Sequence, residues 1–138
     1  MSTEIFLDTN ILVYAHSQGD YRTPTACVLL LDGGVVSVQV LNEFASVARA
    51  KLGFAWTEVQ EAVEKIVILC PNPLPLGIET HMCALGLSEK YGFSIWDGLI
   101  IAAAKGAGCR TLYTEDLQHG QIVEGVRIEN PFLNLTRS

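Results

Sequence analysis

The chain has 138 residues, of which 49% are hydrophobic and 17% are charged. This length suits one domain spanning residues 1–138. No apolar run approaches the roughly 18 to 20 residues of a membrane span, and the start MSTEIF lacks the basic region and apolar stretch of a signal peptide. We therefore expect a cytoplasmic protein. The high apolar content favours deeply buried helices or an interface with a second chain over a bare monomer.

The formal net charge is −6, from 15 acidic and 9 basic residues. Taken alone, this charge argues against a nucleic-acid partner, because contacts with phosphate normally need a basic face. The four cysteines, Cys27, Cys70, Cys83 and Cys109, are widely spaced in apolar surroundings, which is typical of buried reduced thiols. His81 and Cys83 lack a second pair at ligand spacing, so no zinc site is predicted.

Short apolar runs alternate with longer amphipathic segments along the chain. We expect strands at residues 4–7, 35–38 and 110–113 and a last, edge strand at residues 126–128. Helices are predicted at residues 10–16, 23–31, 39–51, 57–67, 77–90 and 94–105, with Thr57 and Ser94 as N-caps. This alternation predicts an α/β fold, a three-layer α/β/α sandwich with a central parallel sheet. We expect Val40, Phe44, Val47 and the region of Met82 in its core.

Four acidic residues, Asp8, Glu43, Asp97 and Asp116, adjoin these apolar segments. Asp8 directly follows the first strand, and Asp116 follows the strand at 110–113. The carboxyl ends of parallel strands meet at one rim of a sheet, where active sites gather. Asp97 lies in residues 95–104, a stretch with no other charge that predicts a buried helix. We expect the helix after the second strand to bring Glu43 to the same rim.

Each acid also has a structural explanation when it is considered alone. Asp8 is a good N-cap for the helix that follows it. Glu43 suits a solvated helix flank, and Asp97 completes a capping box with Ser94. Asp116 stands in a turn that an Asx cap would suit.

Considered together, the four acids favour a metal site. Carboxylates about 5 Å apart repel by roughly 3 kcal/mol per pair at an effective dielectric constant of about 20, so cations or protonation must offset the repulsion. Oxygen ligands without His or Cys select Mg²⁺ or Mn²⁺ rather than zinc. Such a site supports attack on phosphorus by a metal-activated water molecule. Without these four acids, 11 acidic residues remain against 9 basic ones, which leaves a charge of −2. Five basic residues are then candidates to guide a polyanion, namely Arg22, Arg49, Lys51, Lys90 and Lys105.

Several segments resemble the motifs of a known family. The segments FLDTNILVYA, VLNEF, YGFSIWDGLIIAAA and LYTEDLQHGQ resemble the four acidic motifs of PIN-domain ribonucleases. Their spacing and the closing VRIENPF are similar to the VapC branch, the toxins of type II toxin-antitoxin pairs. The resemblance covers nearly the whole chain, and four motifs in order are far more specific than LDTN alone.

The resemblance implies an Mg²⁺- or Mn²⁺-dependent endoribonuclease that dimerises and is inhibited by a cognate antitoxin. It implies that Asp8, Glu43, Asp97 and Asp116 are catalytic and bind the metal, with Asn10 and Thr114 in support. Its reaction would be in-line hydrolysis of an RNA phosphodiester, leaving a 5′-phosphate and a 3′-hydroxyl.

Two other functions remain open from the sequence. One is a phosphatase of the haloacid-dehalogenase type, in which an Asp after the first strand attacks phosphorus. That class needs an acid two residues later, where this chain has Asn10. The other is a module without catalytic activity that binds a basic partner peptide through its acidic rim.

Overall fold

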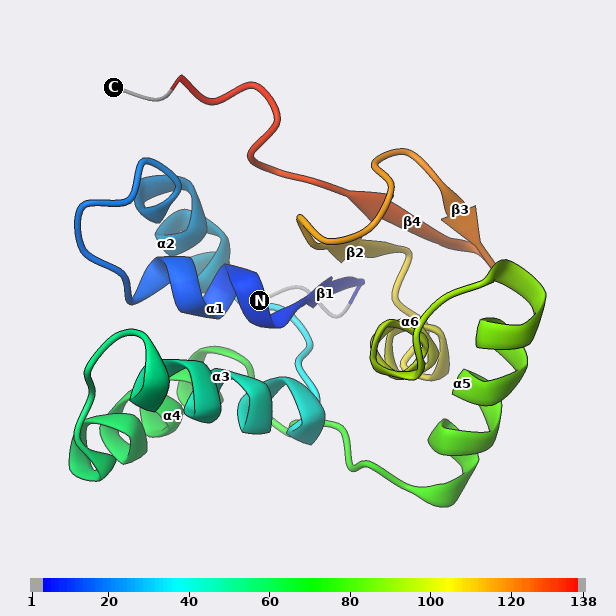
Figure 1. The fold of residues 1–138 in the computed structure, drawn as a ribbon, viewed down its shortest axis with the longest axis horizontal. Helices are drawn as coiled ribbons and strands as arrows, with labels where there is room; N and C mark the ends of the chain where they lie inside the picture. Colours follow the sequence, from blue (N-terminus) through cyan, green and yellow to red (C-terminus); the bar gives the residue numbers. More distant parts are fainter. Residues whose placement is uncertain (1–3, 137–138) are drawn as a thin grey trace.

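The computed structural model describes residues 4–136. In this part of the chain, one short strand precedes the six helices, a second follows them, and the last two form a hairpin (Figure 1). The elements are β1 (Ile5–Leu7), α1 (Thr9–Ala15), α2 (Thr23–Asp32), α3 (Val38–Ala50), α4 (Trp56–Leu69), α5 (Ile78–Tyr91), α6 (Ile95–Gly106), β2 (Thr111–Tyr113), β3 (Ile122–Val123) and β4 (Val126–Glu129).

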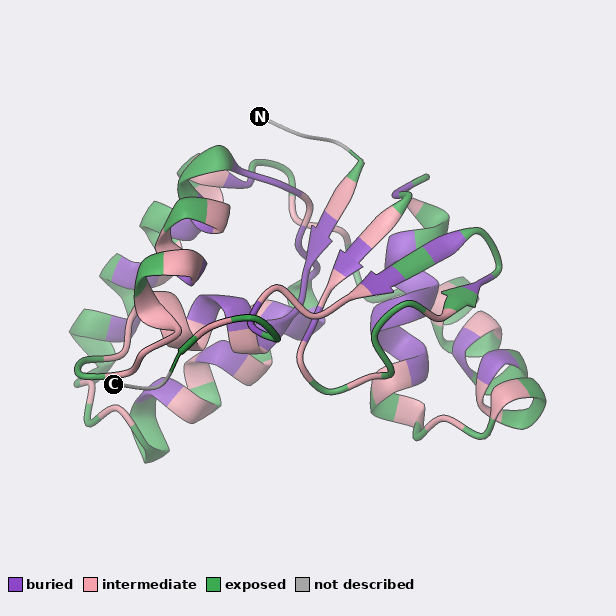
Figure 2. Ribbon diagram, turned by 90° about the horizontal axis from the view of Figure 1, so that it is seen from above, coloured by how far each residue is buried: buried purple, intermediate pink, exposed green. Residues whose placement is uncertain are grey.

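The strands form one sheet in the order β1-β2-β4-β3. Strands β1, β2 and β4 are parallel, with Phe6 beside Leu112 and Leu112 beside Ile128, whereas β3 is antiparallel to β4. Helices α1 to α4 lie on one side of the sheet and helices α5 and α6 lie on the other (Figure 2). The predicted α/β fold with a mostly parallel central sheet is confirmed.

The core lies where the sheet meets its helices. Phe6, Leu112 and Ile128 are fully buried, as are Val40 and Phe44 of α3. In α6 every residue from 98 to 104 is buried, as the absence of charge after Asp97 predicts. The segments that carry the four acidic residues are therefore packed on a rigid apolar core.

Two helix starts show how the local sequence sets the boundaries. The Ser94 hydroxyl accepts the N–H of Asp97 at 3.1 Å, which confirms Ser94 as the N-cap of α6. The predicted cap at Thr57 is wrong, because α4 begins at Trp56 with Ala55 as its N-cap. Glu58 sets this earlier start by accepting the Ala55 N–H at 2.9 Å, a bond that stabilises a first turn in the manner of a capping box.

The predicted strand at residues 35–38 is not formed as a strand. Only single bridges join Val35 to Phe6 and Ser37 to Leu74. The Ser37 side chain accepts the Val40 N–H at 3.2 Å, so helix α3 begins where the strand was expected to continue.

The predicted edge strand at residues 126–128 lies inside the sheet. Its place at the edge is taken by β3, which a two-residue turn joins to β4. Glu124 and Gly125 have φ of 49° and 85° in this turn, the left-handed pair that tight hairpins need. With only two residues, β3 is too short to show an alternating pattern in the sequence.

Helix α5 departs from the predicted core. Met82 is 59% exposed, and Ile78 and Leu85 on the same face are 72% and 44% exposed. The four cysteines are thiols, with Cys70 and Cys109 buried. Among residues 4–136 no helix is both long and apolar enough to cross a membrane.

Candidate active site

Asp8 occupies the carboxyl end of β1 and is only 4% exposed. Its carboxylate accepts the backbone N–H of Thr9 at 2.6 Å and the hydroxyl of Thr114 at 2.8 Å. The pKa of Asp8 is nevertheless raised to about 6, mainly by burial and to a lesser extent by the charges of Asp116 and Glu43, against the effect of the two hydrogen bonds. Asp8 is therefore the N-cap of α1, as its structural explanation predicts, and also a buried carboxylate that a cation would stabilise.

Asn10 and Thr114 connect Asp8 with Asp116 across the ends of β1 and β2. The Asn10 amide donates to the Thr114 hydroxyl at 3.3 Å and to the Asp116 carboxylate at 3.2 Å. The Asp116 N–H donates to the same hydroxyl at 3.1 Å, and Thr114 is fully buried. The Asp8 N–H bonds to the Tyr113 carbonyl at 3.1 Å, so the parallel pairing itself brings these segments together.

Glu43 is held in place by two residues that the sequence analysis missed. Gln39, one turn earlier on α3, donates to Glu43 Oε1 at 2.8 Å, and the Thr9 hydroxyl donates to Oε2 at 3.1 Å. The separation of four residues between Gln39 and Glu43 was a usable signal, because such residues are neighbours on a helix face. The Thr9 contact joins residues distant in the chain and has no local signature.

Asp97 lies in the first turn of α6, where it is partly buried. This burial raises the pKa of Asp97, a hydrogen bond with the Ser94 side chain lowers it, and the charge of Asp116 raises it again. The capping interaction expected for Asp97 is present. It coexists with an electrostatic link to Asp116.

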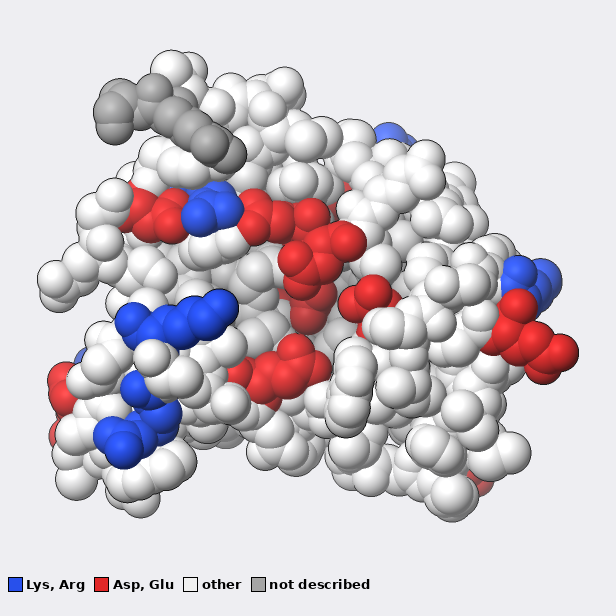
Figure 3. Space-filling model, viewed as in Figure 1, with Lys and Arg blue, Asp and Glu red and all other residues white. Residues whose placement is uncertain are grey.

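The four acids, Asp8, Glu43, Asp97 and Asp116, are called the acidic site below. Figure 3 shows acidic side chains gathered in the middle of one face, near the start of α1. Among residues 4–136, no three His, Cys, Asp or Glu side chains lie close enough together to hold one metal ion. The donor chemistry does fit a hard cation: the side chains are carboxylates, Asp8 is desolvated, and the buried Oδ1 atom of Asn10 has no hydrogen-bond partner.

A second network supports the loop that carries Asp116. The Arg22 guanidinium bonds to Glu115 at 2.9 and 3.0 Å and to Asp20 at 2.8 Å. It lies 3.7 Å from the centre of the Tyr14 ring, and the Tyr14 hydroxyl donates to Glu115. Glu115 is thereby tied to α1 and α2, which fixes the backbone next to Asp116.

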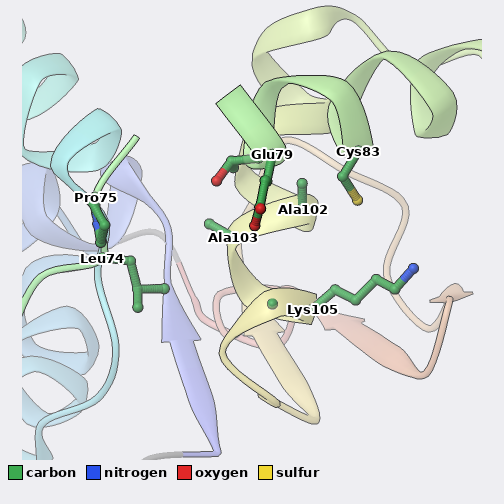
Figure 4. Close-up of a pocket in the computed structure, with 9 residues that line it drawn as sticks. Leu74, Pro75, Glu79, Cys83, Ala102, Ala103 and Lys105 are labelled. Atoms are coloured by element: carbon green, nitrogen blue, oxygen red, sulfur yellow. The ribbon is translucent and has the colours of Figure 1, made fainter. Parts of the chain in front are cut away.

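A cavity of about 390 Å³ lies elsewhere, between the segment after α4 and helices α5 and α6. Figure 4 shows Glu79 and Cys83 of α5 on one wall, with Leu74 across from them and Lys105 of α6 below. None of the four acids lines this cavity. It is therefore separate from the acidic site.

The sequence matches the family described as PIN domain over residues 5–124, most of the chain. The protein belongs to the PIN-domain family. A sequence search of curated proteins finds no match.

Solved structures share the fold. A toxin-antitoxin complex from Klebsiella pneumoniae contains a chain that is 18% identical, with 94% of this chain and 98% of that chain covered and a TM-score of 0.70. FitAcB from Neisseria gonorrhoeae is 21% identical over 94% of this chain and 99% of that chain, with a TM-score of 0.65. VapC20 from Mycobacterium tuberculosis, a sarcin-ricin loop cleaving toxin, is 19% identical over 81% and 91%, with a TM-score of 0.64.

Proposed function

We propose that the protein is a metal-dependent endoribonuclease and the toxin of a toxin-antitoxin pair. The observation that carries this proposal is the desolvated Asp8 carboxylate, which Thr114 and Asn10 link to Asp116 at the rim of the sheet. Membership of the PIN-domain family supports it. So does the likeness in fold to a sarcin-ricin loop cleaving toxin.

The four residues of the acidic site share one task in this proposal, and neighbouring polar residues position them. Asp8, Glu43, Asp97 and Asp116 would hold Mg²⁺ or Mn²⁺, which supplies activation of a water molecule and charge stabilisation at phosphorus. Thr114 orients Asp8 through its 2.8 Å hydrogen bond, and Asn10 orients Asp116. Gln39 and Thr9 fix the two oxygens of Glu43. No side chain is required as a nucleophile.

We test this proposal with Asp8→Asn and Asp97→Asn, which remove charge with little change in shape. Each should lower cleavage of total cellular RNA in the presence of Mg²⁺ or Mn²⁺ by at least about a hundredfold, because each removes a ligand from the cation. Chelation with EDTA should stop the wild-type reaction. Cleavage sites mapped after brief induction of wild type and of Asp97→Asn provide the cellular measurement.

Glu89→Gln is the matched control, since Glu89 is an exposed acid on α5 that lies outside the four acidic motifs. It should cleave RNA as wild type does. Full activity in Asp8→Asn or Asp97→Asn would overturn the assignment. Absence of any cleavage by antitoxin-free protein with Mn²⁺ would favour the module that binds a basic peptide, and trapping of a phosphorylated Asp8 would favour the phosphatase.

The proposed partners are RNA, a cognate antitoxin and a second copy of the chain. Chains of similar fold occur in a toxin-antitoxin complex from Klebsiella pneumoniae and in VapBC2 from Rickettsia felis bound to promoter DNA, which supports the antitoxin. The exposed apolar row on α5, made of Ile78, Met82 and Leu85, supports dimerisation. Their spacing of four and three residues places them on one helix face.

A further inference from the structure

A second hollow lies at the far end of the helices that bear the acidic site. This cleft has a volume of about 340 Å³ and is bounded by the end of α1 and the turn from α3 to α4. Its lining is mostly polar and includes His16, Gln18, Lys51, Phe54 and Glu58. The volume is within the range of small-ligand sites.

Two neighbouring helices connect the acidic site to this cleft. Helix α1 begins beside Asp8 and ends at its C-cap His16, and helix α3 carries Glu43 and ends at its C-cap Lys51. At a rise of 1.5 Å per residue, the distances from Asp8 to His16 along α1 and from Glu43 to Lys51 along α3 are about 10 to 12 Å. Nucleotides stacked about 3.4 Å apart along a strand cover that distance in roughly three steps. A short RNA strand is therefore long enough to reach from the acidic site to the cleft.

The cations near the cleft differ from the others in their charge partners. Among residues 4–136, the bases that form ion pairs with carboxylates are Arg22, Lys90, Lys105, Arg110 and Arg127. In the same part of the chain, Arg49, Lys51 and Lys65 form no ion pair; of these, Lys51 lines the cleft and Arg49 contacts Trp56. Figure 3 shows basic side chains over the ends of α3 and α4, on the same face as the acidic side chains. Two cations without an ion pair, Arg49 and Lys51, are thus available to a phosphate group at the cleft.

Trp56 adds an aromatic surface at the same place. It stands between the lining residues Phe54 and Glu58 and is 61% exposed. The Arg49 guanidinium lies 4.7 Å from the centre of its ring and donates to the Phe54 carbonyl at 2.9 Å, which holds both side chains in place. Exposed aromatic rings beside basic groups bind unpaired bases by stacking, which a duplex does not offer.

The polar groups of the cleft are also fixed in position. His16 donates through Nδ1 to the Leu12 carbonyl at 2.7 Å, and its ring packs 5.0 Å from that of Phe44, which leaves Nε2 for a ligand. Glu58, the acid in the lining, is engaged with the Ala55 N–H.

We propose that this cleft, with Arg49, Lys51 and Trp56, binds single-stranded RNA a few nucleotides from the bond that the acidic site cleaves. This inference rests on the proposed ribonuclease function and assigns it a substrate-binding surface. Arg49 and Lys51 contact the phosphates, and Trp56 stacks on a base.

We test the surface by fluorescence anisotropy with a labelled, mixed-sequence single-stranded RNA of about 16 nucleotides, the upper end of typical site sizes. Asp97→Asn protein with Mg²⁺ is the background, so that the RNA stays intact. Adding Arg49→Ala and Lys51→Ala should weaken binding by on the order of tenfold. The slope of log affinity against log salt should become shallower by about 1.4, or about 0.7 per lost contact.

Trp56→Ala should weaken binding by about tenfold with the salt slope unchanged, because it removes stacking and no charge. Lys65→Ala is the matched control, since it removes an exposed unpaired cation that does not line the cleft, and its affinity should equal that of the background. A duplex of the same sequence should compete poorly. Lys51→Glu alone provides a second charge variant if loss of Arg49 unfolds the turn.

The surface is overturned if the double variant and Lys51→Glu keep full affinity, or if Lys65→Ala loses as much. It is also overturned if no single-stranded RNA binds. If the duplex competes as well as unlabelled single-stranded RNA and Trp56→Ala has no effect on affinity, the assignment of single-stranded RNA as the ligand is refuted. The double variant is also made in the wild-type background. If RNA cleavage depends on Asp97 but the double variant has an unchanged KM, the proposed RNA-binding surface is refuted and the ribonuclease function is retained. If RNA binding depends on Arg49 and Lys51 but the wild-type protein cleaves no RNA, the ribonuclease function is refuted and the RNA-binding surface is retained.

Discussion

Asp8 illustrates how one residue combines a structural and a chemical role. It follows the fully buried Leu7, caps helix α1 and receives two hydrogen bonds. These bonds stabilise its charge, yet burial outweighs them and the pKa rises to about 6. The ionised carboxylate is therefore a source of instability in the metal-free protein, as is common where function requires a buried charge.

This cost should be visible as a pH dependence of stability in metal-free protein. Folding raises the pKa of Asp8 from 3.8 to about 6, so the folded state binds the proton more tightly than the unfolded chain. The resulting stabilisation is complete below pH of about 4 and is lost as the pH rises through about 6, with a magnitude of about 3 kcal/mol. Urea unfolding in EDTA across this range measures it.

Asp8→Asn is the comparison for this measurement, because it leaves the other titrating groups in place. The difference in unfolding free energy between wild type and variant should change with pH in this window. Parallel curves for the two proteins would show that Asp8 is not desolvated as the structure indicates.

Gln39 is expected to act through Glu43. Replacing it by Ala removes the 2.8 Å hydrogen bond to Oε1 and frees Glu43 to rotate away from the acidic site. Loss of such a supporting contact typically lowers metal affinity or activity 10- to 100-fold. We expect a loss in this range for Gln39→Ala, measured as RNA cleavage at a series of Mn²⁺ concentrations, with partial rescue at high Mn²⁺. Gln60→Ala, at an exposed position of α4, should behave as wild type, and an equal loss in both variants would refute the role of Gln39.

At the scale of the elements, the contact of α5 with α6 depends on one glycine. A Cβ at Gly98 would lie 2.9 Å from the Ala84 carbonyl oxygen and 2.9 Å from the Ser88 hydroxyl. The absence of a side chain therefore lets the two helices approach closely beside Asp97. The start of α6, which carries Asp97, is positioned by this contact.

Gly98→Ala should lower the free energy of unfolding by about 1 to 3 kcal/mol, because the added methyl group forces the helices apart. Gly86→Ala on α5 is the matched control, since a Cβ there meets no atom within 4 Å. That change should raise stability by up to about 1 kcal/mol through helix propensity. Chemical denaturation of both variants measures the difference, and stabilisation of both would contradict the close approach.

The elements also show which features the sequence predicts and why. Helix α6 is predictable because an uncharged stretch follows a serine cap, and both signals are local. The order of the sheet is not, because it depends on β4 pairing with β2 rather than on any property of residues 126–129. The strand expected at residues 35–38 failed because the Ser37 cap competes with continued pairing.

The same distinction holds for the acidic site. Asp8 and Asp116 are predictable neighbours, since both follow strands that a parallel sheet places side by side. The separation of the four carboxylates is not predictable, because it depends on bonds such as that between Thr9 and Glu43, 34 residues apart. The contribution of Gln39 could have been predicted from helix periodicity, because Gln39 lies four residues before Glu43.

At the scale of the whole molecule, the exposed face of α5 bears on assembly. Ile78, Met82 and Leu85 form an uncharged row that two copies can bury against each other by twofold symmetry. We predict that Ile78→Glu with Met82→Glu converts a dimer into a monomer, because charges would then face each other in the contact. Light scattering after size exclusion measures the mass. Ile68→Glu on α4, where Ile68 is 75% exposed, should remain a dimer, and a dimeric double variant would place the interface elsewhere.

The pairing of β1 with β2 has a consequence for the synthesis of the protein. Asp8 bonds to Thr114, 106 residues later in the chain, and Ile5 pairs with Thr111. The first strand therefore cannot pair with β2 until nearly the whole polypeptide has left the ribosome, and contacts this distant in the chain form slowly. A nascent or truncated chain lacks the rim on which the acids converge. The acidic site therefore stays incomplete near the ribosome until translation of the protein is almost finished.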